Sequence, residues 1–323
     1  MSKQLIFLFL FMYACSNMTW IQMILTFMFL FCGFLYLIYA QQESILYLNN
    51  TIPPKKTCDN PSPYANPKQN GIEYEDVWLH TSDNIKLHAW FIPYNSELLN
   101  DNNNNDTSND SNDTNDVNIP TLIFYHANAG NMGFRLPNII ALHKSVLCNL
   151  FILSYRGYGE SDGEPNEKGL MIDAKTAYEY IKNKRKCNNI YVFGRSLGGA
   201  VAIYIGCEYS NDKEFKGIII ENTFTCISDM VKKVFPFLDF YFIKKYMLKI
   251  HWKSIERINK INKKLLFIGS QNDEVVPHEQ MIKLYNNATY NDKTFYKVNN
   301  ATHNDAWMIG GDTYFDKIKQ FIV

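Results

Sequence analysis

The stretch that decides the fold is "NIYVFGRSLGGAVAIYIGCE", residues 189–208. Its first six residues have the apolar, β-branched character of a buried strand, and "LGGAVAIYIGCE" is typical of a buried helix. Between them, Ser196 is the central residue of G-x-S-x-G, the sequence form of the nucleophile elbow of serine hydrolases. An elbow needs small neighbours, and Gly194, Gly198 and Gly199 supply them. The stretch therefore predicts a nucleophilic serine on a sharp turn from strand to helix.

A second stretch, "GESDG" at residues 159–163, fits the same pattern around Ser161. Its surroundings, "YRGYGESDGEPNE", are rich in glycine, proline and charge, and Pro165 prevents a helix from starting at Ser161. We therefore interpret Ser161 as a turn residue that follows a strand ending at Tyr155. The strand-helix context, and not the motif itself, selects Ser196 as the nucleophile.

The chain around the elbow predicts one α/β domain. Residues 74–80 and 85–91 alternate between apolar and polar and are joined by "TSDN", which favours an antiparallel hairpin. Short apolar runs follow at residues 121–126, 149–155, 189–194, 217–221, 264–269 and 294–298. Such runs are typical of strands covered on both faces, and helical stretches lie between them, the clearest from Asn166 to about Asn183. Strands that alternate with helices indicate a mainly parallel sheet.

The N-terminus predicts a membrane anchor. Residues 1–40 carry a single charge, at Lys3, and the run from Trp20 to Ala40 is long enough to span a bilayer. A cleaved signal peptide with its core at Leu5–Ala14 is the alternative, but the second apolar run outlasts such a core. We expect a transmembrane signal-anchor over residues 1–40, a linker over 41–70 and the catalytic domain over 71–323.

The orientation of the anchor rests on few charges. Lys3 precedes the apolar run, and Lys55 and Lys56 are the first basic residues after it. The positive-inside rule leans toward a single-pass, type II protein with a cytosolic N-terminus. Residues 100–118 form an insert of mostly Asn and Asp, which predicts a disordered loop because it cannot bury apolar area. This insert carries N-x-S/T sequons at Asn105, Asn109 and Asn112.

Composition excludes several function classes. The formal net charge is zero, which argues against a nucleic-acid partner. The seven cysteines form no C-x-x-C pair, which argues against a zinc site or a disulfide framework. The glycines of "GYGESDG" miss the spacing of a dinucleotide-binding loop. We therefore expect no metal and no cofactor.

The serine needs a base and an acid, which follow it in the order Ser, Asp or Glu, His in α/β hydrolases. Of the three downstream histidines, His303 lies in the loop after the last strand, at the sheet edge where the elbow opens. We predict His303 as the base. His278 follows Pro277 at the expected start of a helix, and His251 lies among apolar and basic residues.

Asp273 is the predicted acid, because it directly follows the penultimate strand and so lies on the same edge. Glu221, which ends an earlier strand, is its structural rival. Glu274 is expected to point elsewhere, and Asp305 is only two residues from the predicted base.

The oxyanion formed during acyl transfer needs two backbone N–H donors. One is expected from Leu197, the residue after the nucleophile. The other is expected from the loop after the strand at 121–126, where Asn128 is the choice and Ala127 its competitor.

Six motifs, in this order, resemble the membrane-anchored α/β-hydrolase-domain proteins of the bud-emergence (Bem-like) group. They are "HANAGNMGFRLP", "SYRGYGESDGEPNEKGL", "GRSLGGAVAI", "ENTF", "GSQNDEVVP" and "THNDAW". The resemblance covers about residues 70–323 outside the insert. It implies an α/β-hydrolase fold with a type II anchor and a Ser–Asp–His triad at Ser196, Asp273 and His303. The sequence departs from the group at Ala127, where the group usually has glycine, and this bears on the oxyanion geometry.

Members of this group are regarded as serine hydrolases, and their relatives include protein depalmitoylases. The hypothesis is therefore a membrane-tethered hydrolase of acyl esters or thioesters, with an acylated protein or lipid as substrate. The alternatives are a serine peptidase of the same fold and a non-catalytic scaffold. The aromatic segment at residues 234–252 is either a lid or wall of a small helical cap for an acyl chain, or an ordinary helix packed on the sheet.

Overall fold

The computed structural model describes residues 19–94 and 119–322, and the predicted strands form one sheet there. The strands are β1 (Glu75–His80), β2 (Lys86–Ile92), β3 (Thr121–Tyr125), β4 (Asn149–Leu153), β5 (Ile190–Arg195), β6 (Phe215–Glu221), β7 (Lys264–Ser270) and β8 (Lys293–Val298). Their order is β1-β2-β4-β3-β5-β6-β7-β8. β2 is antiparallel to β1 and to β4, whereas the pairs from β4 to β8 are parallel. The predicted hairpin and mainly parallel sheet are confirmed.

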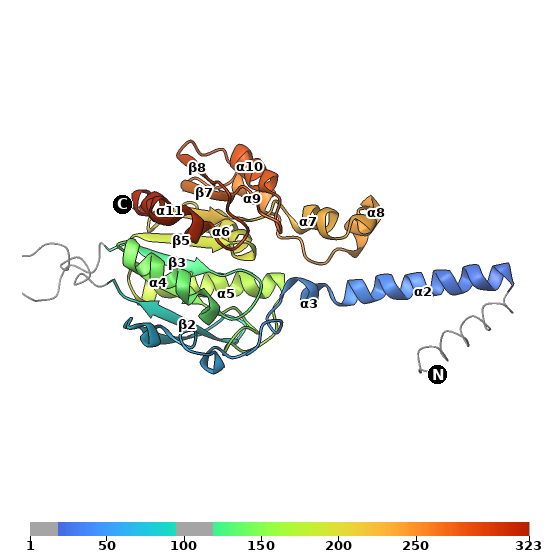
Figure 1. Ribbon diagram of the computed structural model, residues 1–323, viewed down its shortest axis with the longest axis horizontal. Helices are drawn as coiled ribbons and strands as arrows, with labels where there is room; N and C mark the ends of the chain where they lie inside the picture. Colours follow the sequence, from blue (N-terminus) through green and yellow to red (C-terminus); the bar gives the residue numbers. More distant parts are fainter. Residues whose placement is uncertain (1–18, 95–118, 323) are drawn as a thin grey trace, which may run out of the picture.

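Helices cover both faces of this sheet, which explains why its inner strands are apolar throughout (Figure 1). α4 (Leu136–Ser145) and α11 (Ala306–Ile322) pack on one face, where Leu122 and Phe124 of β3 point. α5 (Glu167–Glu179), α6 (Leu197–Glu208), α9 (Ser254–Ile258) and α10 (His278–Asn287) pack on the other, against Ile123 and Tyr125. The core is therefore two apolar layers with the sheet between them.

The predicted helix at residues 166–183 is present. Asn166 caps α5 by accepting a 2.8 Å hydrogen bond from the amide of Gly169, and α5 continues into a π-helical turn at Tyr180–Lys184. This capping fixes where the long loop that contains Ser161 ends and the helix begins.

The apolar run near the N-terminus forms α2 (Trp20–Ala40), whose 21 residues carry no charge and are not buried by the domain. At 1.5 Å per residue the helix is about 31 Å long, enough to cross a membrane. It extends away from the domain (Figure 1). Lys3, the run Leu5–Ala14 and the insert at residues 100–118 with its sequons lie outside the described residues.

The segment at residues 41–70, for which the sequence predicts a linker, is packed against the domain. It contains α3 (Gln42–Leu46) and two 3-10 turns, Thr57–Asp59 and Pro67–Asn70. Tyr47 is fully buried, and its hydroxyl accepts a 3.1 Å hydrogen bond from Nε1 of Trp252. α2 is thus joined to the domain through partly buried chain.

A small helical cap lies between β6 and β7. It consists of α7 (Ile227–Val234), the 3-10 turn Pro236–Leu238 and α8 (Tyr241–Met247). The cap projects from the domain on the same side as α2 (Figure 1). Because parallel strands end together at one edge, this side is also where the loops after β5, β7 and β8 meet.

Candidate active site

Ser196 lies on the turn between β5 and α6 with φ +55° and ψ −120°, a region that a serine rarely adopts. The turn is tight enough to require glycine on both sides. A Cβ at Gly194 would lie 2.0 Å from the carbonyl oxygen of Gly198, and one at Gly198 would lie 1.9 Å from that of Tyr125. The backbone around Ser196 is therefore the strained elbow that its sequence predicts.

Neighbouring strands hold the strained turn in place. The amide of Ser196 donates to the carbonyl oxygen of Glu221 over 2.9 Å, which extends the pairing of β5 with β6. The hydroxyl of Thr223 donates to the carbonyl oxygen of Ser196 over 2.6 Å. Both bonds fix the backbone of Ser196 and leave its side chain uninvolved.

Asp273 and His303 come together from the loops after β7 and β8. Nδ1 of His303 lies 2.8 Å from Oδ2 and 2.9 Å from Oδ1 of Asp273. Oδ1 also accepts hydrogen bonds from the amides of Val275 and Val276, at 2.9 and 2.8 Å. The carboxylate is therefore fixed by its own loop and oriented toward the imidazole.

Two further residues hold the backbone of the His303 loop: Asn222, which the sequence did not single out, and Glu274, which was expected to point elsewhere. Asn222, at φ +47°, donates to the carbonyl oxygen of His303 over 2.9 Å. The carboxylate of Glu274 accepts from the amide of His303 over 3.1 Å. One signal in the sequence could have pointed to Asn222. It directly follows a buried strand, at the edge of the sheet where the site lies, and asparagine is one of the few residues that tolerate the positive φ of such a turn. No local pattern pointed to the contact made by Glu274.

Ser196 and His303 are both buried at the carboxyl edge of the sheet, but no hydrogen bond joins Oγ to the ring within the described residues. Such bonds are often long or misaligned without substrate and tighten when it binds. The structure therefore forms the acid–histidine pair and the elbow separately. The complete relay from Ser196 to Asp273 stays a prediction.

The competing serine, Ser161, has a structural position. Its hydroxyl donates to the carbonyl oxygen of Ser154 over 2.8 Å and accepts from the amide of His88 over 2.9 Å. It thereby fastens its loop to β2 and to the end of β4. A hydroxyl that is buried and bonded on both sides is not available to attack a substrate.

The rival acids and bases are also placed elsewhere. The buried carboxylate of Glu221 pairs with Arg195 and accepts a 2.5 Å hydrogen bond from the hydroxyl of Tyr314. Asp305 accepts from the amide of Thr302 over 2.6 Å, next to the start of α11. His278 begins α10, as its sequence predicts, and its Nδ1 lies 2.9 Å from the carbonyl oxygen of Ser270.

The two predicted oxyanion donors both line the pocket beside Ser196. Leu197 is the first residue of α6, where amides lack partners within the helix. The loop of Asn128 is held because its carbonyl oxygen accepts from the amide of Leu48 and the hydroxyl of Tyr158, at 3.1 and 2.9 Å. The side-chain amide of Asn128 donates to the carbonyl oxygen of Leu46 over 3.0 Å, but within the described residues neither the backbone N–H of Asn128 nor that of Leu197 donates to another group.

His126, two residues before Asn128, is an uncharged packing residue. Burial, aided by the nearby Arg135 guanidinium, lowers the pKa of its imidazole from 6.5 to about 3. Its Nδ1 lies 2.7 Å from the carbonyl oxygen of Ala127, and its ring packs 4.3 Å from that of Tyr155. Ala127 is buried in this loop.

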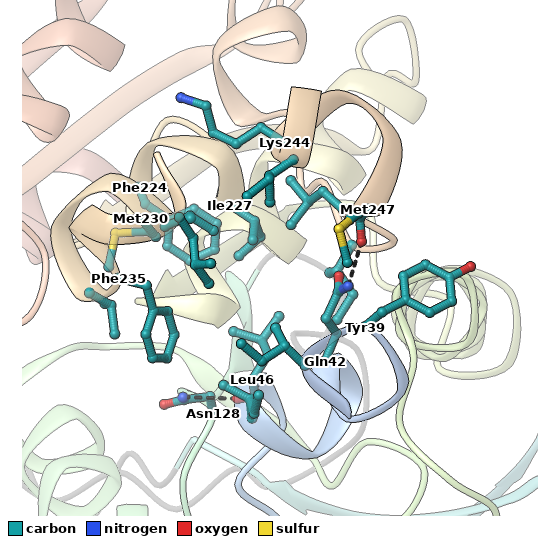
Figure 2. Close-up of a pocket in the computed structure, with 18 of the residues that line it drawn as sticks. Tyr39, Gln42, Leu46, Asn128, Phe224, Ile227, Met230, Phe235, Lys244 and Met247 are labelled. Atoms are coloured by element: carbon teal, nitrogen blue, oxygen red, sulfur yellow. Dashed lines mark hydrogen bonds between the residues drawn. The ribbon is translucent and has the colours of Figure 1, made fainter. Parts of the chain in front are cut away.

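A cavity of about 250 Å³, lined in part by Ser196, lies between the domain, the cap and the end of α2 with α3 (Figure 2). The domain contributes Phe224, Val275 and Val276, and the cap contributes Ile227, Met230 and Phe235, among others. Lys244 is the one charged residue on the walls among the described residues, and its amine is paired with Asp239. No cluster of His, Cys, Asp or Glu in the described chain is arranged to hold a metal ion.

This sheet, with a serine elbow after its fifth strand, is the architecture of the α/β hydrolases. Among solved structures, the Pyrococcus furiosus esterase Pf2001 shares the fold, with a TM-score of 0.60 and 20% identity over 80% of this chain and 94% of the esterase. A family model described as "Serine aminopeptidase, S33" matches residues 148–254.

Sequence relatives place the chain more closely. It is 36% identical to Protein bem46 of Schizosaccharomyces pombe over 293 residues, which are 90% of this chain and 87% of that protein. The chain belongs to the bem46 family of α/β-hydrolase-domain proteins, as the six motifs predict. It is also 33% identical to the "Uncharacterized membrane protein YNL320W" of Saccharomyces cerevisiae, over 80% of this chain and 82% of that one. Together with α2, this relative suggests a membrane anchor.

Proposed function

We propose that this protein is a membrane-anchored serine hydrolase that cleaves acyl esters or thioesters, with an acylated protein or a lipid as substrate. The observation that carries the proposal is the apolar cavity that begins at Ser196, the residue on the strained elbow. Apolar walls bind a hydrocarbon chain by removing it from water, and they place its carbonyl carbon beside the hydroxyl.

The proposed chemistry follows from the positions of the groups. His303 accepts the proton of Ser196 while Oγ attacks the carbonyl carbon, and Asp273 stabilises the resulting imidazolium. The amides of Leu197 and Asn128 donate to the oxyanion. Collapse of the tetrahedral intermediate releases the alcohol or thiol, which takes the proton from His303, and leaves the acyl group on Ser196. Water, activated by His303, then hydrolyses the acyl-enzyme.

The description of the family model raises a peptidase as a second candidate. An aminopeptidase must recognise a protonated α-amino group, for which a carboxylate in the pocket is the ordinary partner. In the described part of the chain no Asp or Glu lines the cavity. This opposes a peptidase and favours an uncharged acyl chain.

A non-catalytic scaffold is the third candidate. A scaffold has no need of the strained φ of Ser196 or of an imidazole oriented by a carboxylate, and both features carry a conformational or desolvation cost. The presence of both features at the same edge of the sheet favours a catalytic protein over a scaffold. We further propose the type II orientation, with the N-terminus in the cytosol, on the charges that flank α2.

Fluorophosphonate labelling of the full-length protein tests the proposal. Wild type and Ser161→Ala are expected to be labelled, whereas Ser196→Ala is not. Hydrolysis of a p-nitrophenyl ester and of an acyl thioester should be lost in Ser196→Ala and in His303→Ala. Labelling of Ser196→Ala at the wild-type level would contradict the assignment of the nucleophile.

The N-glycosylation sequons in the insert at residues 100–118 provide a test of the orientation of the protein in the membrane. If the domain is lumenal, endoglycosidase treatment should increase the mobility of the protein from cells, and this shift should be lost when Asn105, Asn109 and Asn112 are replaced by Gln. A cytosolic domain would show no glycan on any of the three.

A further inference from the structure

The end of the anchor helix is part of the wall of the cavity. Leu35, Ile38 and Tyr39 of α2 line it, together with Gln42 and Leu46 of α3. Tyr39, Gln42 and Leu46 lie opposite the cap (Figure 2). Leu35 lies five residues before the end of α2, about 7.5 Å along the helix axis. If α2 spans a bilayer, this wall of the cavity therefore extends to the depth of the lipid chains.

Hydrogen bonds hold the cap against this end of the anchor. The side-chain amide of Gln42 donates to the carbonyl oxygen of Met247 over 2.6 Å (Figure 2). Its oxygen accepts from the backbone amide of Lys249 over 2.8 Å. The amine of Lys249 also lies 4.1 Å from the centre of the Tyr39 ring. The position of α8 relative to α2 is thus set by specific bonds between residues some 200 positions apart.

The outer face of the cap is aromatic and exposed. Its side chains Phe237, Phe240, Tyr241, Phe242 and Tyr246 do not line the cavity, and Phe242 and Tyr246 are 71% and 67% exposed. Soluble proteins rarely expose a contiguous patch of this kind unless it contacts a partner or a membrane.

The charges of the cap indicate which of these it contacts. Residues 227–250 contain five lysines and two aspartates. Lys245 lies between the rings of Tyr241 and Tyr246, with its amine 5.4 and 5.2 Å from their centres. Aromatic side chains with interleaved lysines are typical of segments that lie in the interface of a membrane with anionic lipids.

We infer that α8 lies in the membrane interface beside α2, and that the two helices form an entrance through which an acyl chain passes from the bilayer to Ser196. This inference rests on the proposed function for the identity of the ligand, and on α2 as the anchor. The substrate is one whose acyl chain is already embedded in the membrane, and its ester or thioester group reaches the serine without the chain crossing water.

Lipid photolabelling of the full-length protein tests the position of α8. In vesicles of phosphatidylcholine and phosphatidylserine that contain a phospholipid with a diazirine in its acyl chain, peptide mapping should find label in α2 and in residues 237–246. Tyr290, which is also exposed but precedes β8 at the opposite edge of the sheet, is the internal control. Label in α2 with none in residues 237–246 would overturn the inference.

Kinetics of a double variant, Phe242→Ser with Tyr246→Ser, test the entrance. For a long-chain acyl thioester embedded in the vesicles, we expect turnover to fall about tenfold, the loss that follows when about 1.4 kcal/mol of apolar insertion is removed. Hydrolysis of a short, water-soluble ester should be unchanged, because neither side chain lines the cavity. Tyr290→Ser should change neither rate.

Two kinetic results would count against the entrance: an equal fall with both substrates, or no fall with either. The two proposals also fail separately. If the wild type hydrolyses no substrate, the proposed function is wrong, while the photolabelling still decides where α8 lies.

Discussion

Nδ1 of His303 lies 2.8 Å from Oδ2 of Asp273, although thirty residues separate the two in the chain. The pair forms because β7 and β8 are parallel neighbours, so the loops that follow them meet at one edge. The second oxygen of the carboxylate is fixed by amides of its own loop. The acid can therefore hold the imidazole in one orientation and one tautomer.

Asp273→Asn should lower kcat for a soluble ester by about 10³- to 10⁴-fold, because the amide favours the wrong tautomer of His303. Glu221→Gln is the matched control. It leaves the buried Arg195 without a counter-charge, so we expect a lower melting temperature but a nearly normal kcat per folded molecule. Equal kcat losses in the two variants would contradict the assignment of the acid.

Asn222→Gly should lower kcat about tenfold without a comparable change in KM, since it removes the hydrogen bond that holds the carbonyl of His303. Glycine tolerates the positive φ of this position, whereas alanine does not. Asn222→Ala should therefore show the same kcat loss and, in addition, a lower melting temperature. A normal kcat in both variants would show that the loop is held without Asn222.

Gly198→Ala should destabilise the domain by about 3 kcal/mol or prevent folding, because the new methyl group would overlap the carbonyl oxygen of Tyr125. Gly33→Ala is the control, since its Cβ would meet no other atom within 4 Å. Thermal unfolding of both variants in detergent, followed by tryptophan fluorescence, measures the difference. Equal stability would mean that the elbow relaxes more readily than its geometry indicates.

The stability of the domain should fall as the pH decreases from about 6.5 toward 3, in part because of His126. Its ring is neutral in the folded protein over this range but becomes protonated in the unfolded chain, so acid favours unfolding. His126→Phe keeps a ring between Tyr155 and Tyr158 and removes the proton-binding site. Its melting temperature should depend less steeply on pH than that of the wild type, and an equal slope would contradict the prediction.

Ile227→Trp should shift the substrate preference toward short acyl chains, because Ile227 lines the cavity and a larger side chain reduces its volume of about 250 Å³. The ratio of kcat/KM for long and short acyl thioesters is the measurement, and we expect it to fall at least about tenfold. Ile282→Trp, on the exposed side of α10, should leave the ratio unchanged. An unchanged ratio in Ile227→Trp would mean that the chain binds elsewhere.

The sequence was most informative where the physical cause is local. The elbow follows from five consecutive residues, since only glycine fits at positions 194 and 198. The strands follow from continuous apolar runs, which belong between two layers of helices. The proximity of Asp273 and His303 follows from the parallel order of the strands that precede them.

The parts that could not be predicted depend on contacts between distant segments. Glu274 accepts a hydrogen bond from the amide of His303, which lies in a different loop, and no sequence pattern predicts a bond between these two residues. The hydrogen bond from Gln42 to Met247 also joins segments that are distant in the chain. Because the sequence does not reveal such contacts, residues 41–70 were predicted to be a linker. For the aromatic segment at residues 234–252, the structure favours the lid interpretation, because one side of it lines the cavity and the other is exposed.

Tyr47 lies buried seven residues after the end of α2, with its hydroxyl bonded to the indole of Trp252. If α2 spans a membrane, as proposed, a domain attached this close to it has little freedom to rotate or to move away from the membrane surface. The proposed hydrolase would then meet only substrates that diffuse in the same leaflet, and its rate would depend on their surface density and not on their bulk concentration. A version cut free at residue 70 would lose both this two-dimensional search and one wall of its own cavity.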